Sequence, residues 1–145
     1  MIPKLIKGGK FVDDRGSITF ANDFDMSRVK RFYYICHHDT VTVRAWQGHK
    51  RESKWFHVFA GKFLVKLIQP DNWEVPSQNS SIASFTLDAT DSTVLYIPSG
   101  FINGFKALEP NSSMLVFSDV TLDESQRDDF RFEPNSWFDW QKIKK

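Results

Sequence analysis

Short runs of β-branched and aromatic residues, in which apolar and polar side chains tend to alternate, fill most of this chain. Successive side chains of a strand point to opposite faces, so this alternation indicates strands with one buried side. Turn residues separate the runs at short intervals, which is typical of a β-sandwich or barrel. The sequence therefore predicts an all-β fold. The expected strands are residues 17–20, 31–36, 40–44, 55–59, 62–68, 82–87, 93–98, 104–108 and 113–118.

The segments between these runs carry their own signals. The runs 55–59 and 62–68 flank Ala60-Gly61, which predicts a β-hairpin. Residues 69–81 are polar and rich in turn formers, so we expect an exposed loop, anchored by Trp73. Residues 122–127 form a helical turn in this interpretation, begun by Thr121 or Asp123. The aromatic residues after 129 are expected to pack onto the body of the fold.

Length and charge limit the classes of protein that fit. At 145 residues the chain suits a single domain, residues 1–145. Nineteen Lys and Arg against eighteen Asp and Glu leave a net charge of +1, too little to favour nucleic acid or an anionic membrane as partner. No apolar run approaches the length of a membrane helix, and Lys residues interrupt the N-terminus where a signal peptide would be apolar. A lone cysteine, Cys36, makes no internal disulfide, so we expect a cytoplasmic protein.

Two segments carry the chemistry. The first is Arg44-Ala45-Trp46-Gln47-Gly48-His49-Lys50, continuing to Lys54, and the second covers residues 96–105, with Pro98, Gly100 and Asn103. Together they resemble the two motifs of the cupin superfamily, which implies a jelly-roll fold (a double-stranded β-helix). Metal-binding cupins carry His-x-His and a Glu in the first motif and a further His in the second.

Three of those four ligand positions are altered in this chain. Gln47 stands at the first His, Lys54 falls where the Glu is expected, and Asn103 replaces the last His, which leaves His49 alone. Amides are poor transition-metal ligands and a lysine repels a cation. We therefore expect no metal and no other cofactor.

The resemblance is stronger to the metal-free cupins that act on sugar nucleotides. Residues 11–16, 96–105 and 118–125 resemble segments of the dTDP-4-dehydrorhamnose 3,5-epimerase family. Residues 44–50 are similar to the Arg-Gly-x-His-x-His-Lys motif of the short dTDP-sugar 3,4-ketoisomerases. The resemblance implies a nucleotide-linked 4-keto-6-deoxyhexose as substrate and proton transfer at a carbon next to the keto group.

Within that resemblance, each polar residue has an expected role. His49 matches the second His of the ketoisomerase motif and is the expected base, because an imidazole titrates near neutrality. Lys54 and Arg44 are expected to stabilise the enolate, with Gln47 and Asn103 as neutral hydrogen-bond donors in the substrate site.

Arg15, in the turn of the first segment, is expected to bind the diphosphate, because a guanidinium contacts phosphate oxygens in pairs. A carboxylate should orient His49, and the candidates are Asp88, Asp119 and Glu133. The aromatic content of 15% and the cupin resemblance together predict a homodimer.

A second function class stays open. Gln47 lies at the base position of the epimerases and Val120 at their acid Tyr, and neither side chain can transfer a proton. A non-catalytic cupin that binds a sugar nucleotide or carbohydrate would share these features. The same residues therefore fit an isomerase or epimerase that uses His49, or a binding module.

Overall fold

The computed structural model describes residues 1–142, so the last three residues of the predicted domain, 143–145, lie outside it. Its strands are β1 Lys4–Lys7, β2 Gly9–Asp13, β3 Gly16–Phe20, β4 Arg31–His37, β5 Val43–His49, β6 Lys54–Ala60, β7 Lys62–Ile68, β8 Ile82–Asp88, β9 Thr93–Ile97, β10 Phe101–Ala107, β11 Ser112–Ser118 and β12 Phe130–Arg131. The helix α1 covers Leu122–Gln126, and single 3-10 turns cover Ala89–Asp91 and Trp140–Lys142.

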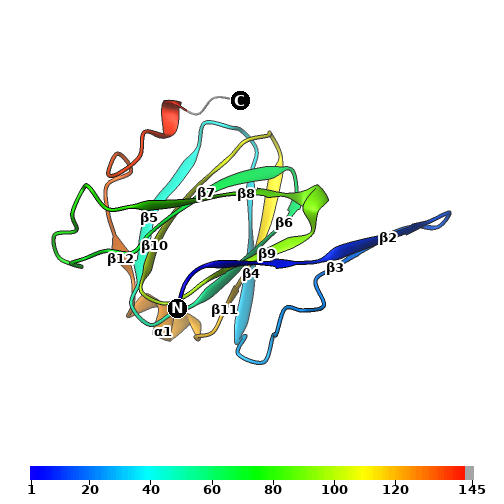
Figure 1. Cartoon of the computed structure of the whole chain (residues 1–145), viewed down its shortest axis with the longest axis horizontal. Coiled ribbons are helices and arrows are strands. Elements are labelled where there is room, and N and C mark those ends of the chain that lie inside the picture. The colour runs from blue at the N-terminus through cyan, green and yellow to red at the C-terminus, as the bar shows by residue number, and fades with distance from the viewer. Residues whose placement is uncertain (143–145) are drawn as a thin grey trace.

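Two five-stranded sheets form the body of the fold. One has the strand order β1-β9-β6-β11-β4 and the other β12-β5-β10-β7-β8, with antiparallel pairing throughout. The sheets face each other, as Figure 1 shows. This is the jelly-roll arrangement, so the all-β prediction is confirmed.

Apolar side chains from both sheets fill one part of the space between them. Phe56, Leu95 and Val116 of the first sheet meet Phe63 and Val65 of the second, and each of these side chains is almost fully buried. Burial on this scale supplies the main favourable free energy of folding. The strands around this core are thereby held at fixed positions.

The C-terminal aromatic residues cover the outer side of the second sheet. Trp46 of β5 and Trp140 are buried there, and Phe132, Trp137 and Phe138 pack against them. The indole of Trp46 donates to the carbonyl oxygen of Ser136 at 2.9 Å. The expected packing of the aromatic tail onto the body is confirmed, and it leaves the inner side of β5 free for a site.

The predicted hairpin at Ala60-Gly61 is wrong, although both of its strands exist. β6 pairs with β9 and β11, whereas β7 pairs with β8 and β10 in the other sheet. Gly61, at φ +70°, takes the chain from one sheet to the other, and a Cβ there would lie 2.1 Å from the Ser112 hydroxyl oxygen. Alternation fixes which side of a strand is buried, but not which strand lies beside it.

Two strand boundaries also differ from the prediction. β5 begins at Val43 rather than residue 40, because Asp39 accepts hydrogen bonds from the backbone N–H groups of Val41 and Thr42 and holds them in a turn. β5 then continues to His49, so the first motif lies within a strand instead of joining two strands. In the same way, β10 begins at Phe101 and contains Asn103.

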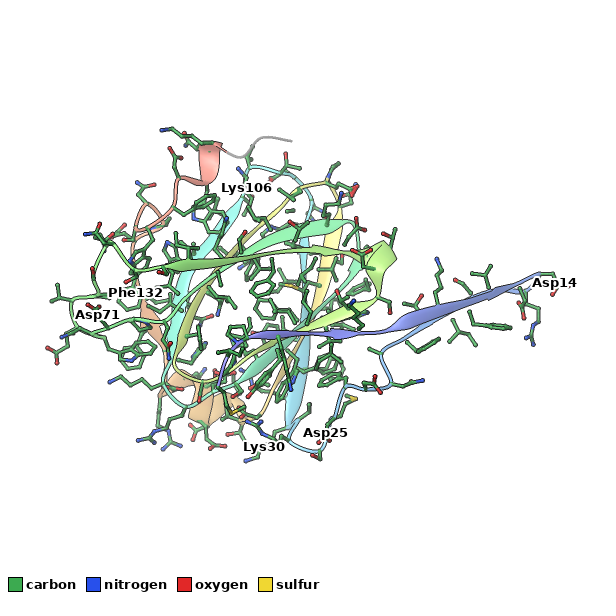
Figure 2. The ribbon with its side chains drawn as sticks, viewed as in Figure 1. Asp14, Asp25, Lys30, Asp71, Lys106 and Phe132 are labelled. Carbon is green, nitrogen blue, oxygen red and sulfur yellow. The ribbon has the colours of Figure 1, made fainter. Side chains whose placement is uncertain are left out.

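The N-terminal segment contains two strands that the sequence prediction missed, β1 and β2. β2 pairs with β3 in a two-stranded hairpin that projects from the body (Figure 1). Figure 2 shows Asp14 at its far end. Phe11, Val12 and Ile18 on this hairpin are each more than half exposed.

Two predicted connections are confirmed. Thr121 caps α1: its hydroxyl accepts from the backbone N–H of Glu124, whose carboxylate in turn accepts from the backbone N–H of Thr121. Residues 69–81 contain no strand, and Trp73 is anchored against β5 beside Gly48. Within residues 1–142 no helix is long and apolar enough to cross a membrane.

Candidate active site

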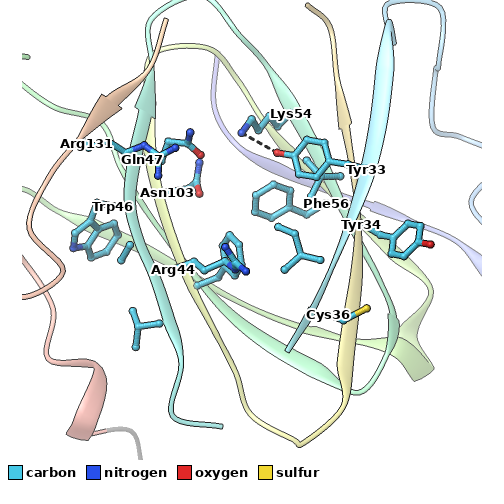
Figure 3. Close-up of a pocket in the computed structure, with 15 residues that line it drawn as sticks. Tyr33, Tyr34, Cys36, Arg44, Trp46, Gln47, Lys54, Phe56, Asn103 and Arg131 are labelled. Atoms are coloured by element: carbon cyan, nitrogen blue, oxygen red, sulfur yellow. Dashed lines mark hydrogen bonds between the residues drawn. The ribbon is translucent and has the colours of Figure 1, made fainter. Parts of the chain in front are cut away.

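A cavity of about 670 Å³ lies between the two sheets, next to the apolar core. Strands β4, β5, β6, β10, β11 and β12 all contribute to its wall. Figure 3 shows Gln47, Asn103 and Arg131 on one side and Tyr33 and Lys54 on the other. The polar side chains that we assign to this wall are Tyr33, Arg44, Gln47, Lys54, Asn103 and Arg131. A volume of this order suits a small organic ligand.

All the charged side chains in the wall of the cavity are positive. It carries three cations, Arg44, Lys54 and Arg131, and none of its lining residues is an Asp or a Glu. Asp129, just outside, accepts hydrogen bonds from Arg131 at 2.7 Å and Gln47 at 3.1 Å. Burial alone would raise the pKa of Asp129, but these two hydrogen bonds outweigh it and the pKa is lowered. The cavity therefore favours an anionic ligand.

A hydrogen bond to a histidine fixes the guanidinium group of Arg44. Its Nε donates to Nε2 of the buried His37 at 3.0 Å. Burial, and then the positive charge of Arg44, lower the pKa of His37. A neutral imidazole in this position orients the guanidinium without adding charge. The remaining nitrogens of Arg44 are thus available to a ligand in the cavity.

Lys54 begins β6 and is only 4% exposed. Its ammonium group donates a hydrogen bond to the hydroxyl oxygen of Tyr33 at 3.2 Å (Figure 3). The buried carboxylate of Glu52 lies nearby. Burial would raise the pKa of Glu52, but the charge of Lys54 and hydrogen bonds from Ser118 and Ser125 outweigh it, so the pKa is lowered and the group stays an anion.

His49 lies behind the wall of the cavity. Its side chain is 3% exposed and is not among the residues that line the cavity. Nδ1 is 2.6 Å from the carbonyl oxygen of Asp128, which places the ring proton on Nδ1 and leaves Nε2 with its lone pair. Nε2 has no hydrogen-bond partner among the described residues. Burial, and then the charge of Lys54, lower the pKa of His49, so the ring is neutral at pH 7.

The carboxylates around His49 are Glu52 and Asp128. Glu52 Oε1 lies 3.4 Å from Nδ1 of His49. The Asp128 carboxylate accepts hydrogen bonds from three consecutive backbone N–H groups, those of residues 50, 51 and 52, at 2.8–2.9 Å. It therefore fixes the turn that joins β5 to β6.

The three carboxylates that the sequence analysis proposed as partners of His49 lie away from its ring. Asp88 caps the turn after β8, and Glu133 lies in an exposed segment. Asp119 bonds to Arg28 and to the backbone N–H of Ser53. These three candidates were wrong because the ring of His49 is held by a backbone carbonyl oxygen, that of Asp128, and the carboxylate near it is Glu52, three positions along the same turn. Contacts of this kind depend on how the turn folds.

Arg15 lies outside the cavity of its own chain. It is at the turn of the projecting hairpin, its side chain is 82% exposed, and it pairs with Asp13 at 2.6 Å. The structure thus brings Arg44, Gln47, Lys54 and Asn103 together in one wall, but it does not bring Arg15 to them.

Two residues of the wall were missed by the sequence analysis, Tyr33 and Arg131. Tyr33 lies in the aromatic run of β4, where every second side chain points inward, so the alternation carried a signal that was not used. Arg131 is in the two-residue strand β12, which pairs with Gly48 and Gln47. A strand so short leaves no pattern in the sequence.

No group of three or more His, Cys, Asp and Glu residues within residues 1–142 is placed to hold a metal ion. At the positions where metal-binding cupins have ligands, the cavity presents Gln47, Lys54 and Asn103. A lysine and two amides are a poor donor set for a transition metal.

Comparison with known proteins gives one family and a set of similar structures. The family model FdtA, described as WxcM-like, C-terminal, matches residues 1–136. Among curated protein sequences, none matches the chain significantly.

Three solved structures illustrate the likeness. A dTDP sugar isomerase from Desulfovibrio desulfuricans is 20% identical, with a TM-score of 0.79 over 98% of this chain and 92% of that one. A mutant of the 3,4-ketoisomerase QdtA from Thermoanaerobacterium thermosaccharolyticum, in complex with TDP-4-keto-6-deoxyglucose, is 24% identical, with a TM-score of 0.69 over 90% and 87%. A dTDP-4-dehydrorhamnose 3,5-epimerase from Bacillus anthracis, with TDP and PPi bound, is 19% identical, with a TM-score of 0.72 over 92% and 79%. The TM-scores show a shared fold, and at these sequence identities they show the fold alone.

The donor set of the cavity generates a first prediction. Protein purified without added metal should contain no stoichiometric transition metal, because Lys54 and two amides stand where ligands would be needed. Elemental analysis checks this. One tightly held transition ion per chain would contradict the ligand argument.

Proposed function

The chain belongs to the FdtA family, described as WxcM-like, C-terminal, and from this premise we propose that it is an isomerase or epimerase of a nucleotide-linked 4-keto-6-deoxyhexose, with dTDP as the nucleotide. The reaction is a proton transfer at a carbon next to the keto group. It needs neither a metal nor another cofactor. The observation that carries the proposal is the cavity between the sheets, whose wall has three cations and no carboxylate.

The charge of the wall supports an anionic nucleotide part. A diphosphate carries its negative charge on several oxygens, and Arg44 and Arg131 present guanidinium groups that bind such oxygens in pairs. Gln47 and Asn103 add amide groups that hydrogen-bond to sugar hydroxyls. The bound ligands of the ketoisomerase and epimerase structures, TDP-4-keto-6-deoxyglucose and TDP, favour the same substrate class.

His49 is the proposed base. Its fixed tautomer leaves Nε2 unprotonated, and its lowered pKa keeps the ring neutral at pH 7, so it is ready to accept a proton. Lys54 and Arg44 supply the positive charge that an enolate oxygen requires. For direct transfer, the bound sugar has to reach a ring that does not itself line the cavity.

The reaction is tested by proton exchange with the solvent. The protein is incubated with dTDP-4-keto-6-deoxyglucose in deuterated water, and the ring positions are followed by NMR. We expect deuterium at C3 for ketoisomerase or 3-epimerase chemistry, and at C3 and C5 for a double epimerase. No deuterium with any 4-keto sugar nucleotide would contradict the proposed reaction.

The role of His49 has its own test. His49→Asn should lower exchange by about 10²–10⁴-fold, because an amide cannot accept the proton, while dTDP binding persists. Burial and the charge of Lys54 lower the pKa of His49, so the ring becomes protonated only at a pH below the usual pKa of histidine. The exchange rate of the wild type should therefore decrease only below that pH.

His57→Asn is the matched control. His57 also contacts a backbone carbonyl, that of Thr93 at 2.9 Å, but it lies outside the cavity wall. Its replacement should leave exchange unchanged. Exchange that survives in His49→Asn would show that the base is another residue.

A binding module is the second candidate function, and Gln47 favours it. Gln47 stands where the epimerases have their base, and an amide cannot accept a proton at neutral pH. Its NH2 group donates a hydrogen bond to Asp129 instead. The same exchange experiment separates the two: binding of dTDP sugars without any exchange would support the module.

We also propose a homodimer that works in the cytoplasm. The projecting β2–β3 hairpin exposes Phe11, Val12 and Ile18, apolar side chains that a second copy of the chain would cover. This hairpin carries Arg15 away from the cavity of its own chain. In a dimer, Arg15 could therefore serve the partner's nucleotide, which reconciles its position with its expected role.

This proposal predicts a specific binding defect. Arg15→Ala should weaken dTDP binding about tenfold or more, since a charge-assisted hydrogen bond is worth about 1.5–3 kcal/mol. Lys10→Ala, on the same exposed hairpin, should not. Calorimetric titration measures the affinities, and sedimentation should show a dimer at micromolar concentration. A monomer, or equal affinities in all three proteins, would contradict the proposal.

A further inference from the structure

We propose that His37 is a positioning residue of the cavity: only its neutral imidazole holds the guanidinium of Arg44 in place, so the affinity for a nucleotide sugar depends on the protonation state of His37. The inference rests on the proposed function for the identity of the ligand. It concerns a histidine that does not itself line the cavity and to which the sequence analysis gave no role.

One hydrogen bond between the two sheets carries the inference. His37 is the last residue of β4, and its side chain is buried. Its Nε2 accepts the hydrogen bond of Arg44 Nε at 3.0 Å, which places the ring proton on Nδ1. Arg44 comes from β5, in the opposite sheet, and Figure 3 shows its side chain reaching into the cavity. A ligand in the cavity therefore contacts Arg44 and is influenced by His37 through it.

Arg44 differs from the other two cations of the wall in the charge of its partner. Arg131 donates to the Asp129 carboxylate. Lys54 has the anionic carboxylate of Glu52 nearby. The side chain that fixes Arg44, in contrast, is an uncharged ring. The hydrogen bond thus orients the guanidinium while its full positive charge remains available to the ligand.

Stability gives no reason for a histidine at position 37. Nδ1 carries the ring proton and is buried, but it has no hydrogen-bond partner among the described residues. An unpaired buried donor has a free-energy cost that an apolar ring would avoid. The ring centroid lies 5.3 Å from that of Phe63 and 5.9 Å from that of Phe105, a setting that suits a phenylalanine. What His37 adds is the acceptor for Arg44.

Within residues 1–142, the charged groups that act on His37 are Arg44 of β5 and Asp39 in the turn after β4. The uncharged neighbours from the other elements around the ring are Phe63 of β7, Phe105 of β10 and Ser112 of β11. Burial, and then the charge of Arg44, lower the pKa of His37, and the negative charge of Asp39 offsets only part of this. The ring is therefore neutral at pH 7 and becomes protonated below the usual pKa of histidine.

Protonation of His37 removes the contact that holds Arg44. An imidazolium has an N–H group at each nitrogen and no free lone pair, so it cannot accept the hydrogen bond from Arg44 Nε. The two neighbouring positive groups then repel each other in a place with little water. We expect the guanidinium to leave its position, and the affinity for an anionic ligand to decrease as the pH falls through the pKa of His37.

The affinity for dTDP-glucose, measured by calorimetric titration at decreasing pH, tests the inference. This nucleotide sugar is the suitable probe because dTDP has a terminal phosphate that itself titrates at about pH 6, whereas dTDP-glucose has none. The imidazole NMR signal of His37, assigned by its absence in His37→Gln, shows when the ring has titrated. By that pH, wild type should bind about tenfold less tightly than at pH 8. Unchanged or rising affinity, or unfolding before His37 titrates, would refute the inference.

Two substitutions separate the hydrogen bond from the packing of the ring. His37→Gln keeps an acceptor for Arg44, the amide oxygen, and does not titrate. It should bind dTDP-glucose nearly as tightly as wild type at pH 8 and lose the pH dependence that His37 causes. His37→Phe keeps the ring but has no acceptor, so it should bind about tenfold less tightly already at pH 8. Equal affinities of His37→Phe and wild type at pH 8 would overturn the proposal.

His38→Gln is the matched control, because His38 is the next residue and is exposed. It should keep both the affinity and the pH dependence of wild type. His49 is present in every one of these proteins, so an effect of its protonation would appear in His37→Gln as well and can be subtracted. Melting temperatures at each pH establish that the variants are folded.

The outcomes for the inference and for the proposed function are distinct. If wild type exchanges deuterium with the keto sugar but His37→Phe binds dTDP-glucose as tightly as wild type, the proposed function stands and the inference fails. If dTDP-glucose binds with the expected pH dependence but no 4-keto sugar nucleotide exchanges deuterium, the inference stands and the proposed reaction fails. If wild type binds no nucleotide sugar at any pH, both fail.

Discussion

The turn between β5 and β6 depends on one acidic residue, and the candidate site depends on that turn. Asp128 accepts three backbone N–H groups of residues 50–52 with its carboxylate, while its carbonyl oxygen fixes the ring of His49. β5 and β6 belong to opposite sheets, so this turn sets how their inner faces meet. Gln47 ends up on one side of the cavity and Lys54 on the other. Hydrogen bonds to a charged group are worth about 1.5–3 kcal/mol each, enough to hold a turn without regular structure.

The alternation of side chains was sufficient to predict the strands but not the sheets. Nearly every expected run became a strand, because a strand between two sheets needs one apolar side and the run itself contains that information. Strand partners are decided by contacts between distant segments, and so β6 and β7, joined by Gly61, were wrongly paired. β12 gave no signal, since it is two residues long and is held by β5 rather than by its own pattern.

For the candidate site too, the sequence predicted the features that depend on neighbouring strands but not those that depend on distant contacts. The motif residues Gln47 and Asn103 face each other because β5 and β10 pair directly, in a register that sets them opposite. Such a pairing is what two motifs in neighbouring strands imply. The depth of His49 and the distance of Arg15 from the cavity could not be predicted, because the first depends on how the turn folds over the ring and the second on the direction of a hairpin with few contacts to the body. The sequence analysis passed over Tyr33 because it lies in a run of aromatic residues, and such residues usually belong to the core.

The buried charges behind the cavity are more readily explained by function than by stability. Removing Lys54 and Arg31 from water carries a desolvation cost that their interaction with Glu52 rarely exceeds, and apolar residues of similar volume often stabilise a core equally well. Two serine hydroxyls already hydrogen-bond to Glu52, so the carboxylate does not require Lys54 for solvation. What Lys54 adds is a fixed cation 3.2 Å from the Tyr33 hydroxyl, in a place from which water is largely excluded and electrostatic interactions are strong. A buried lysine in the wall of this cavity is therefore better explained by an anionic ligand than by a contribution to stability.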